Sequence, residues 1–297
     1  MRIGLVGATG VGKTGLALEL ARTESRLALF SCDSMAVYRG MDLGTAKPGP
    51  EELGGMAYRL IDLADPGEEF SVADYQRAAE AAESALEARQ VPLYVGGTGL
   101  YVSAIFDRLS IPPSDPEVRA SIEAELAVVG PEELHRRLSE MDPLAASRME
   151  PGNARRIVRA LEVMAITGRS FSSFGPGLSA YHEPGGRLFG LRMDFELLDR
   201  RIEVRVSELL EQGWLQECER LLAAGPLSRT ASQAIGYQEL FSVLRGEITL
   251  AEAVPVIVRR TRRLARRQRS WFRRDPRIAW HDDPAELGAD LLELLRA

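Results

Sequence analysis

A glycine-rich segment near the start of the chain indicates its fold more strongly than any other part of the sequence. Residues 7–14 read Gly-Ala-Thr-Gly-Val-Gly-Lys-Thr and fit the pattern G-x-x-x-x-G-K-[ST], between an apolar run and a helical pattern. Glycines there let backbone N–H groups turn inward around a diphosphate, and the helix N-terminus and the lysine add positive charge. An ordinary glycine-rich turn is the alternative. The expected phosphate-binding residues are Gly7, Ala8, Thr9, Gly10, Val11, Gly12, Lys13 and Thr14.

The first third of the chain alternates short apolar runs with longer helical patterns. The expected strands lie at residues 3–6, 27–32, 59–63 and 92–95. The expected helices lie at residues 13–24 and 71–89, and the second begins with a capping box of Ser71 and Asp74. This alternation is typical of a parallel sheet with crossover helices. We therefore expect an α/β fold, a P-loop NTPase-like parallel sheet core flanked by helices.

Prolines within residues 111–116 end this alternation, because proline continues neither a helix nor a central strand. From residue 117 to about 169 the sequence is helical, which indicates an all-helical insertion domain. An apolar run at 188–194 then predicts a strand that rejoins the sheet, and we expect only helices from residue 196 onward. The expected domains are a first core part at 1–112, the insertion at 113–184 and a second core part at 185–297.

Composition excludes several classes of protein. With 297 residues, 45% of them hydrophobic and 27% charged, the chain is neither disordered nor a small disulfide-rich scaffold. Its two cysteines have no metal-ligand neighbours at zinc-site spacings. No apolar run approaches a membrane span, and the first residues lack the pattern of a signal peptide. We expect a cytoplasmic monomer that does not associate with membranes.

A second candidate functional residue, Asp33, follows the expected strand at 27–32. Most chains with such a loop bind ATP, and hydrolysis requires an acid at the end of a later core strand that orders magnesium. Here the strand at 92–95 runs instead into Gly-Gly-Thr-Gly at 96–99. Ligands gather at the carboxyl ends of parallel strands, where Asp33 could act as a general base facing the diphosphate. A turn cap is the alternative for this aspartate.

Further segments carry a resemblance to a known family. They read Asp-Ser-Met-Ala-Val-Tyr-Arg-Gly-Met-Asp-Leu-Gly-Thr-Ala-Lys-Pro at 33–48, Phe-Ser-Val-Ala-Asp at 70–74 and Gly-Gly-Thr-Gly-Leu-Tyr at 96–101. Others are Asp-Pro-Glu-Val-Arg at 115–119, Arg-Ala-Leu-Glu-Val at 159–163, Gln-Ala-Ile-Gly-Tyr at 233–237 and Arg-Arg-Gln-Arg-Ser-Trp-Phe-Arg at 266–273. In this order, over nearly the whole chain, they resemble the tRNA dimethylallyltransferase family.

The resemblance implies transfer of a dimethylallyl group from dimethylallyl diphosphate to the N6 amine of the adenosine immediately 3′ of the anticodon in tRNA. In the family's pattern Asp33 is the general base at that amine, and Thr9 lies near the bridging oxygen of the donor. Lys13 and Arg205 match groups that contact the diphosphate. Thr14 matches the contact with Mg²⁺, the expected cofactor. These groups neutralise the departing diphosphate, which lowers the barrier to displacement.

The same resemblance implies contacts with the anticodon stem-loop of tRNA, from which the target adenine has to leave its stack. The implied tRNA-binding residues are Asp33, Ser34, Met35, Ala36, Thr98, Arg119, Arg155, Arg156, Ile157, Val158, Arg159, Gln233, Ala234, Ile235, Gly236, Tyr237, Gln238, Arg266, Arg267, Gln268, Arg269, Ser270, Trp271, Phe272 and Arg273.

The charge of the chain is strongly segregated. The formal net charge is −6, but residues 259–274 contain nine arginines and no acidic residue, which leaves −15 for the remainder. Apolar or neutral residues recur there every three to four positions, so the arginines share the wider face of one helix. An RNA backbone or acidic residues of the same protein would neutralise them, and a solvated face is the third possibility. We expect both RNA and acidic residues of the protein to neutralise the arginines, with Arg266, Arg267 and Arg273 nearest to RNA.

The chain departs from the family's pattern at a few positions. Ala8 stands where proline is frequent, Ala36 replaces a frequent glutamine that would read the base, and Tyr58 replaces a frequent histidine. Three rival functions remain: a P-loop small-molecule kinase, an adenylate isopentenyltransferase and a non-catalytic nucleotide-binding RNA module. The first two leave the arginine-rich helix unexplained, and the third does not need Asp33.

Overall fold

The computed structural model describes residues 1–107, 109–175, 181 and 185–296. The chain divides into two compact units, one formed by Met1–Arg108 together with Tyr181–Ala297 and the other by Leu109–Ala180. The expected end of the insertion, residue 184, lies outside the described residues.

The larger unit is built on a parallel sheet. Its strands are β1 (Ile3–Val6), β2 (Leu27–Ser31), β3 (Tyr58–Arg59), β4 (Val91–Gly96), β5 (Arg187–Leu191) and β6 (Ile278–His281). They pair in the order β3-β2-β4-β1-β5-β6, and all the pairs are parallel. Ile3 of β1 is paired with Leu93 of β4 on one side and with Arg187 of β5 on the other. The expected α/β fold with a parallel sheet is confirmed.

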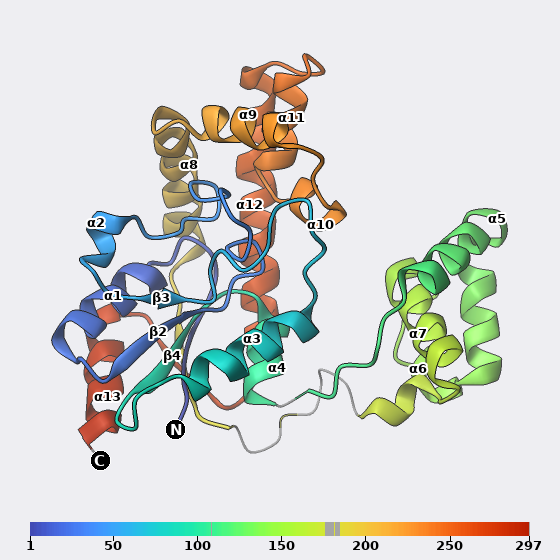
Figure 1. Cartoon of the computed structure of the whole chain (residues 1–297), viewed down its shortest axis with the longest axis horizontal. Helices are drawn as coiled ribbons and strands as arrows, with labels where there is room; N and C mark the ends of the chain where they lie inside the picture. The colour runs from blue at the N-terminus through green and yellow to red at the C-terminus, as the bar shows by residue number, and fades with distance from the viewer. Residues whose placement is uncertain (108, 176–180, 182–184, 297) are drawn as a thin grey trace. The chain divides into compact units, whose positions relative to one another are not determined.

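Helices lie on both faces of this sheet. The helices of the larger unit are α1 (Lys13–Thr23), α2 (Pro50–Leu53), α3 (Val72–Ser84), α4 (Gly99–Phe106), α8 (Phe195–Glu211), α9 (Trp214–Ala224), α10 (Arg229–Ser232), α11 (Tyr237–Leu244), α12 (Leu250–Phe272) and α13 (Pro284–Arg296), not all of which contact the sheet. Figure 1 shows α1 and α13 on one side of the sheet and α3 and α4 on the other. Because both faces are covered, every residue of β1 and β2 is buried, and these strands appear in the sequence as continuous apolar runs.

Three expectations about secondary structure are wrong. The strand expected at 59–63 is reduced to β3, because Leu60 and Asp62 adopt φ values of 64° and 55°, which no strand accommodates. The segment after residue 196 is not purely helical, since β6 adds an edge strand beside β5. The helix expected at 71–89 ends at Ser84, although its capping box of Ser71 and Asp74 is present.

The smaller unit is helical. It contains α5 (Pro116–Met141), α6 (Pro143–Ala146), α7 (Ala154–Thr167) and the short 3₁₀ helix η1 (Phe171–Phe174). Gly130, with φ of 82°, kinks α5 just before Pro131. Ile122, Leu134 and Ile157 contribute to an apolar core that belongs to this unit alone. Within the part of the chain that the structure describes, no helix in either unit is long and apolar enough to cross a membrane.

Candidate active site

The glycine-rich segment at residues 7–14, called the phosphate-binding loop after its expected role, connects β1 to α1 at the carboxyl edge of the sheet. Gly10 and Gly12 have φ values of 85° and 104°, a left-handed conformation that favours glycine. Lys13 begins α1, where its buried Nζ donates a hydrogen bond to the carbonyl oxygen of Ala8 at 2.7 Å. Within the described residues this ammonium has no carboxylate ion-pair partner. The loop therefore presents a desolvated cation at the N-terminus of α1, which favours an anionic ligand.

Three charged groups interact at this loop. Burial lowers the pKa of Lys13 to about 8, with Asp33 opposing this shift and Arg205 adding to it. Burial also lowers the pKa of Arg205, a half-buried residue of α8, and Asp33 again opposes the shift. Two cations thus lie within electrostatic range of one carboxylate, and the excess positive charge is available to a diphosphate.

Asp33 lies two residues beyond β2 and caps a turn, since its Oδ1 accepts a hydrogen bond from the backbone N–H of Met35 at 2.8 Å. The loop after β4 lies against it. The N–H of Thr98 donates to the carbonyl oxygen of Cys32 at 3.2 Å, and the N–H of Ser34 donates to Thr98 Oγ1 at 3.0 Å. Both sequence interpretations of Asp33, turn cap and member of the site, are thus compatible with its position.

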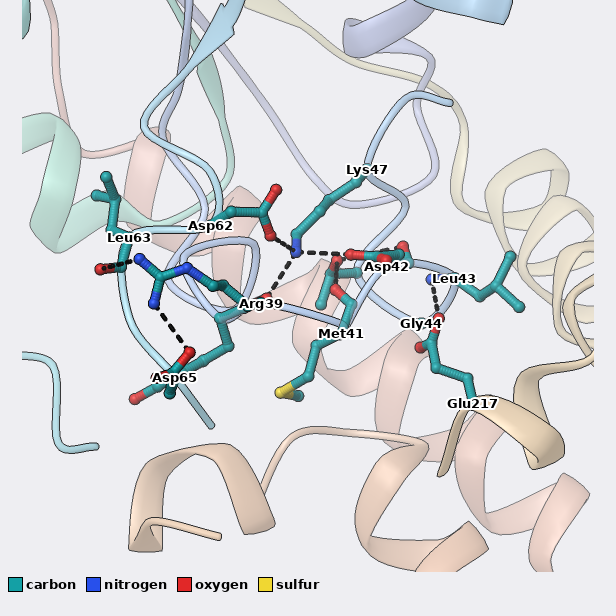
Figure 2. A network of polar contacts seen from close by, with 12 residues as sticks. Arg39, Met41, Asp42, Leu43, Gly44, Lys47, Asp62, Leu63, Asp65 and Glu217 are labelled. Carbon is teal, nitrogen blue, oxygen red and sulfur yellow. Dashed lines mark hydrogen bonds and ion pairs between the residues drawn. The ribbon is translucent and has the colours of Figure 1, made fainter. Parts of the chain in front are cut away.

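Lys47 holds the segment that follows Asp33, as Figure 2 shows. Its Nζ donates to the carbonyl oxygen of Tyr38 at 2.6 Å, to Asp42 Oδ1 at 2.7 Å and to Asp62 Oδ1 at 2.5 Å. Only 5% of this side chain is exposed. The contact with Asp62 joins residues 33–48 to the loop after β3, which also pairs with this segment through backbone hydrogen bonds.

A second set of contacts, from α9 and α11, also holds residues 33–48. Glu217 of α9 accepts hydrogen bonds from the N–H of Leu43 at 2.9 Å, drawn in Figure 2, and from the hydroxyl of Tyr237 at 2.6 Å. That hydroxyl accepts in turn from the N–H of Gly44 at 3.1 Å. Two buried polar side chains from α9 and α11 therefore fix the loop that carries Asp33.

Tyr58, which departs from the family's pattern, lies beside the phosphate-binding loop. Its pKa is raised by burial and by the nearby Asp33, while hydrogen bonding with Ser31 and Thr14 opposes the shift. The phenol therefore supports the threonine that the sequence predicts as a magnesium contact. Neither composition nor periodicity indicated this neighbour.

The donors beside the loop suit a magnesium ion that is shared with a phosphate ligand. Among the described residues, no group of three or more His, Cys, Asp or Glu side chains is placed to hold a metal. The Thr14 hydroxyl, at the start of α1, supplies one hard oxygen donor. Mg²⁺ usually keeps several waters and is held by few protein oxygens together with substrate phosphates, so the residues present fit this ion.

Comparison with known proteins identifies the family. The model of the IPP transferase family matches residues 36–275. The tRNA dimethylallyltransferase of Salinispora arenicola is 47% identical to this chain, over 99% of the chain and 86% of the relative. The chain belongs to the IPP transferase family. It is therefore an enzyme of the transferase class, and the family resemblance inferred from its motifs is confirmed.

Solved structures agree with this assignment. The full-length tRNA isopentenylpyrophosphate transferase of Bacillus halodurans aligns with a TM-score of 0.70 at 37% identity, over 99% of this chain and 96% of that one. A eukaryotic dimethylallyltransferase acting on tRNA aligns with a TM-score of 0.79 at 24% identity, over 99% of this chain and 77% of that one. At this identity the second match supports the fold alone.

Part of the arginine-rich face of this transferase is neutralised within the protein. Arg266 pairs with Asp199 of α8 at 2.7 Å, and Arg262 pairs with Glu203 at 3.0 Å. Arg260 pairs with the buried Glu239. The sequence led us to expect that both RNA and the protein itself neutralise this charge, and these contacts confirm the part of the protein.

Other arginines of the same helix are exposed. Within the described residues, the exposed arginines without an ion pair are Arg259, Arg263, Arg267, Arg273 and Arg274. Arg269 has no ion pair either, but it is half-buried and donates to the carbonyl oxygen of Met193 at 3.3 Å. Most of the exposed five recur every three to four residues, so they form one stripe along α12 and its C-terminal end. We call these five residues the arginine stripe. Of the three arginines expected nearest to RNA, Arg267 and Arg273 belong to it and Arg266 does not.

Several residues expected to contact tRNA have buried side chains. They are Ala36, Ile157, Val158, Ala234, Tyr237 and Phe272. These side chains pack in the cores of their units, so any contact that these positions make with a partner would use the backbone. Arg155, Arg156, Gln233, Gln238, Arg269, Ser270 and Trp271 are exposed or half-buried, as are Ser34, Met35, Thr98 and Ile235.

In the helical unit, two arginines expected to contact tRNA share one carboxylate. Glu162 of α7 is fully buried and accepts hydrogen bonds from Arg119 Nη2 and Arg159 Nη1, both at 2.9 Å, and from the N–H of Asp115 at 3.0 Å. Burial acts to raise the pKa of Glu162, but the hydrogen bonds from Arg159 and Arg119 outweigh it and lower the pKa. Sequence reasoning singled out the arginines and missed the glutamate that orients them, although it lies in one of the quoted motifs.

Proposed function

We propose that this transferase moves a dimethylallyl group from dimethylallyl diphosphate to N6 of the adenosine immediately 3′ of the anticodon in tRNA. The observation that carries the proposal is the grouping of Asp33 with Lys13 and Arg205 at the phosphate-binding loop. A carboxylate that faces a cationic diphosphate cradle is what displacement of a diphosphate by an amine requires. The names of the relatives support the same substrates.

The carboxylate of Asp33 and the cations of the loop would have different roles in the reaction. Asp33 would accept a proton from the adenine N6 amine as a bond forms between N6 and C1 of the dimethylallyl group. The bond between C1 and the bridging oxygen breaks, and the diphosphate leaves with the electron pair. Lys13, Arg205 and the backbone N–H groups of the loop stabilise the charge that develops there. Thr9, in the same loop, would contact the leaving oxygen.

Magnesium fits this arrangement as a partner of the donor. Thr14 would hold Mg²⁺ together with diphosphate oxygens, and the bound ion would supply further neutralisation of the leaving group. Tyr58 would keep the Thr14 hydroxyl in place.

Recognition of tRNA is proposed to use the exposed cations. The arginine stripe offers positive charge that the protein leaves without ion pairs within the described residues. Arg119 and Arg159, oriented by Glu162, offer a second cationic group on the helical unit. Contacts with phosphates would position the anticodon loop. Ser34, next to Asp33 in the chain, and Thr98, whose hydroxyl accepts a hydrogen bond from the N–H of Ser34, would contact the adenine.

One assay tests the proposed reaction. The protein is incubated with labelled dimethylallyl diphosphate and Mg²⁺, and with either unmodified tRNA, AMP, or ATP plus candidate alcohols. We expect label on the tRNA, at the adenosine 3′ of the anticodon after digestion. Label on AMP alone, phosphorylation of an alcohol, or no transfer would each contradict the proposal.

Asp33→Ala supplies the residue-level test. We expect transfer to fall by about 10²–10⁴-fold, the range found for general bases, while tRNA affinity changes no more than a few-fold. Glu211→Ala, at the exposed C-terminal end of α8, is a matched carboxylate control that should leave turnover unchanged. Full turnover by the Asp33 variant would exclude this residue as the base.

We also propose that the enzyme works in the cytoplasm as a monomer. Cys32 and Cys218 are both buried free thiols, which suits a reducing compartment. Sedimentation of the purified protein, with and without tRNA, tests the oligomeric state.

A further inference from the structure

We propose that Gln268 is a positioning residue, which clasps the phosphate-binding loop to the loop after β4 and so keeps the diphosphate cradle in its binding shape. This inference rests on the proposed function. It also gives Gln268 a role different from the tRNA contact that the sequence implied.

The side-chain amide of Gln268 bridges two distant loops. Its Oε1 accepts a hydrogen bond from the backbone N–H of Thr9 at 2.8 Å, and its Nε2 donates to the carbonyl oxygen of Gly97 at 3.0 Å. A backbone N–H can only donate and a carbonyl oxygen can only accept, so the two partners fix the orientation of the amide. Glutamine fits this place because it carries one donor group and one acceptor at the end of a flexible stem.

The loop after β4 is shaped to receive α12. A Cβ atom at position 97 would lie 2.4 Å from Gln268 Nε2, and one at position 99 would lie 2.2 Å from Trp271 Nε1. Gln268 and Trp271 are three residues apart and therefore share one face of the helix. Glycine at both positions lets this face approach the loop closely, which an ordinary turn would not require.

Gln268 is polar, yet it lies on the inward stripe of α12 and not among the exposed arginines. It is half-buried, whereas the neighbouring Arg267 is exposed. Its amide is already engaged on both sides, so a direct contact with tRNA would require one of these bonds to break. Without the amide, the N–H of Thr9 and the carbonyl of Gly97 would lose a partner beside the diphosphate loop, whose shape depends on glycines with left-handed φ.

Binding measurements without tRNA separate the two roles. Inorganic diphosphate and dimethylallyl diphosphate are titrated into the full chain and into Gln268→Met, which keeps the volume of the side chain and removes both hydrogen bonds. We expect the Kd for each to rise about tenfold, the loss expected for one to two hydrogen bonds. The KM for dimethylallyl diphosphate should rise in parallel, while the KM for tRNA stays within about twofold of the wild-type value.

Two further variants complete the design. Gln268→Glu keeps an acceptor for the N–H of Thr9 but places a carboxylate against the carbonyl of Gly97, so it should bind diphosphate no better than Gln268→Met. Gln216→Ala removes an exposed glutamine from α9 and should bind like the wild type. Hydrogen exchange at the Thr9 amide should become faster in Gln268→Met, which keeps the inference testable if that variant is also less stable.

The outcomes that contradict the inference are distinct from those that contradict the proposed function. Unchanged diphosphate binding by Gln268→Met, with or without a loss of tRNA affinity, would overturn the positioning role. Failure of the wild-type protein to bind dimethylallyl diphosphate would contradict the proposed function instead.

Discussion

The chain has two lysines, and the structure uses them in opposite ways. Lys13 lies in the phosphate-binding loop with a backbone carbonyl as its hydrogen-bond partner, and burial lowers its pKa to about 8. Lys47 lies in the neighbouring loop, where Asp42 and Asp62 both pair with it. The difference separates a cation that the protein leaves for an anionic ligand from one that it neutralises for structure. The same distinction separates Arg267 from Arg266 on α12.

The largest expected effect is on catalysis at Lys13. Lys13→Met should lower the transfer rate by about 10³-fold, because a desolvated cation that faces the leaving group is lost from a site that excludes water. Single-turnover rates with unmodified tRNA and dimethylallyl diphosphate measure this change. A variant that keeps more than a tenth of the wild-type rate would show that Lys13 does not stabilise the leaving group.

The same substitution should stabilise the unliganded protein. The pKa of Lys13 is about 8 in the folded chain and 10.5 as its ordinary value, so between these pH values the unfolded chain binds a proton that the folded chain does not. The free energy of unfolding therefore rises with pH across this window, and at pH 7 the charged group costs stability. After allowance for the lost hydrogen bond to Ala8, Lys13→Met should be more stable by about 2 kcal/mol at pH 7.

Urea denaturation without ligand at a series of pH values checks this prediction. The advantage of Lys13→Met should shrink as the pH rises through 8 toward 10. An advantage that does not depend on pH would mean that packing, and not the buried charge, sets the difference.

Substitution of Lys47 should change the free energy of unfolding in the opposite direction. Lys47→Met leaves Asp42 and Asp62 facing each other without a cation, so we expect the free energy of unfolding to fall by about 1–2 kcal/mol. The estimate is small for an ion-pair network because 55% and 44% of the two aspartate side chains are exposed. Lys47→Arg should recover little of the loss, since a planar guanidinium does not fit three acceptors grouped around one ammonium.

Thermal and urea unfolding of the two Lys47 variants test this contrast. Arg220→Met, at an exposed position of α9, serves as the control for loss of a surface cation. Full recovery of stability by Lys47→Arg would show that charge alone, and not the geometry of the ammonium, holds the loop.

Local patterns sufficed to predict those parts of the fold that correspond to an unbroken motif or apolar run in the sequence. The phosphate-binding loop and the buried strands on either side of it appear directly in the sequence. β6 was missed because it contains only one buried residue, Ile278, and follows a long run of helices. The strand at 59–63 failed for another reason: Asp62 takes a left-handed φ while its N–H bonds to the carbonyl of Ala36, which is a tertiary contact.

The residues of the candidate site also differ in whether a local pattern could predict them. Lys13 and Asp33 follow from motif and strand position, whereas Arg205 came only from the family resemblance. The amide of Gln268 reaches Thr9 across 259 residues, and Glu162 lies 43 residues from Arg119. Periodicity shows that such side chains face inward, but it does not show which partner they meet.

The smallest expected effect distinguishes two neighbouring arginines. Arg267→Ala removes an exposed cation without an ion pair in the described part of the chain, so the slope of log K for tRNA against log salt should fall by about 1. Arg266→Ala removes a cation already paired with Asp199, so its slope should change less, with a loss of stability of at most about 1 kcal/mol. Filter binding of tRNA at several salt concentrations between about 50 and 200 mM measures both slopes. Equal changes for the two variants would mean that pairing within the protein does not decide which arginines are available to RNA.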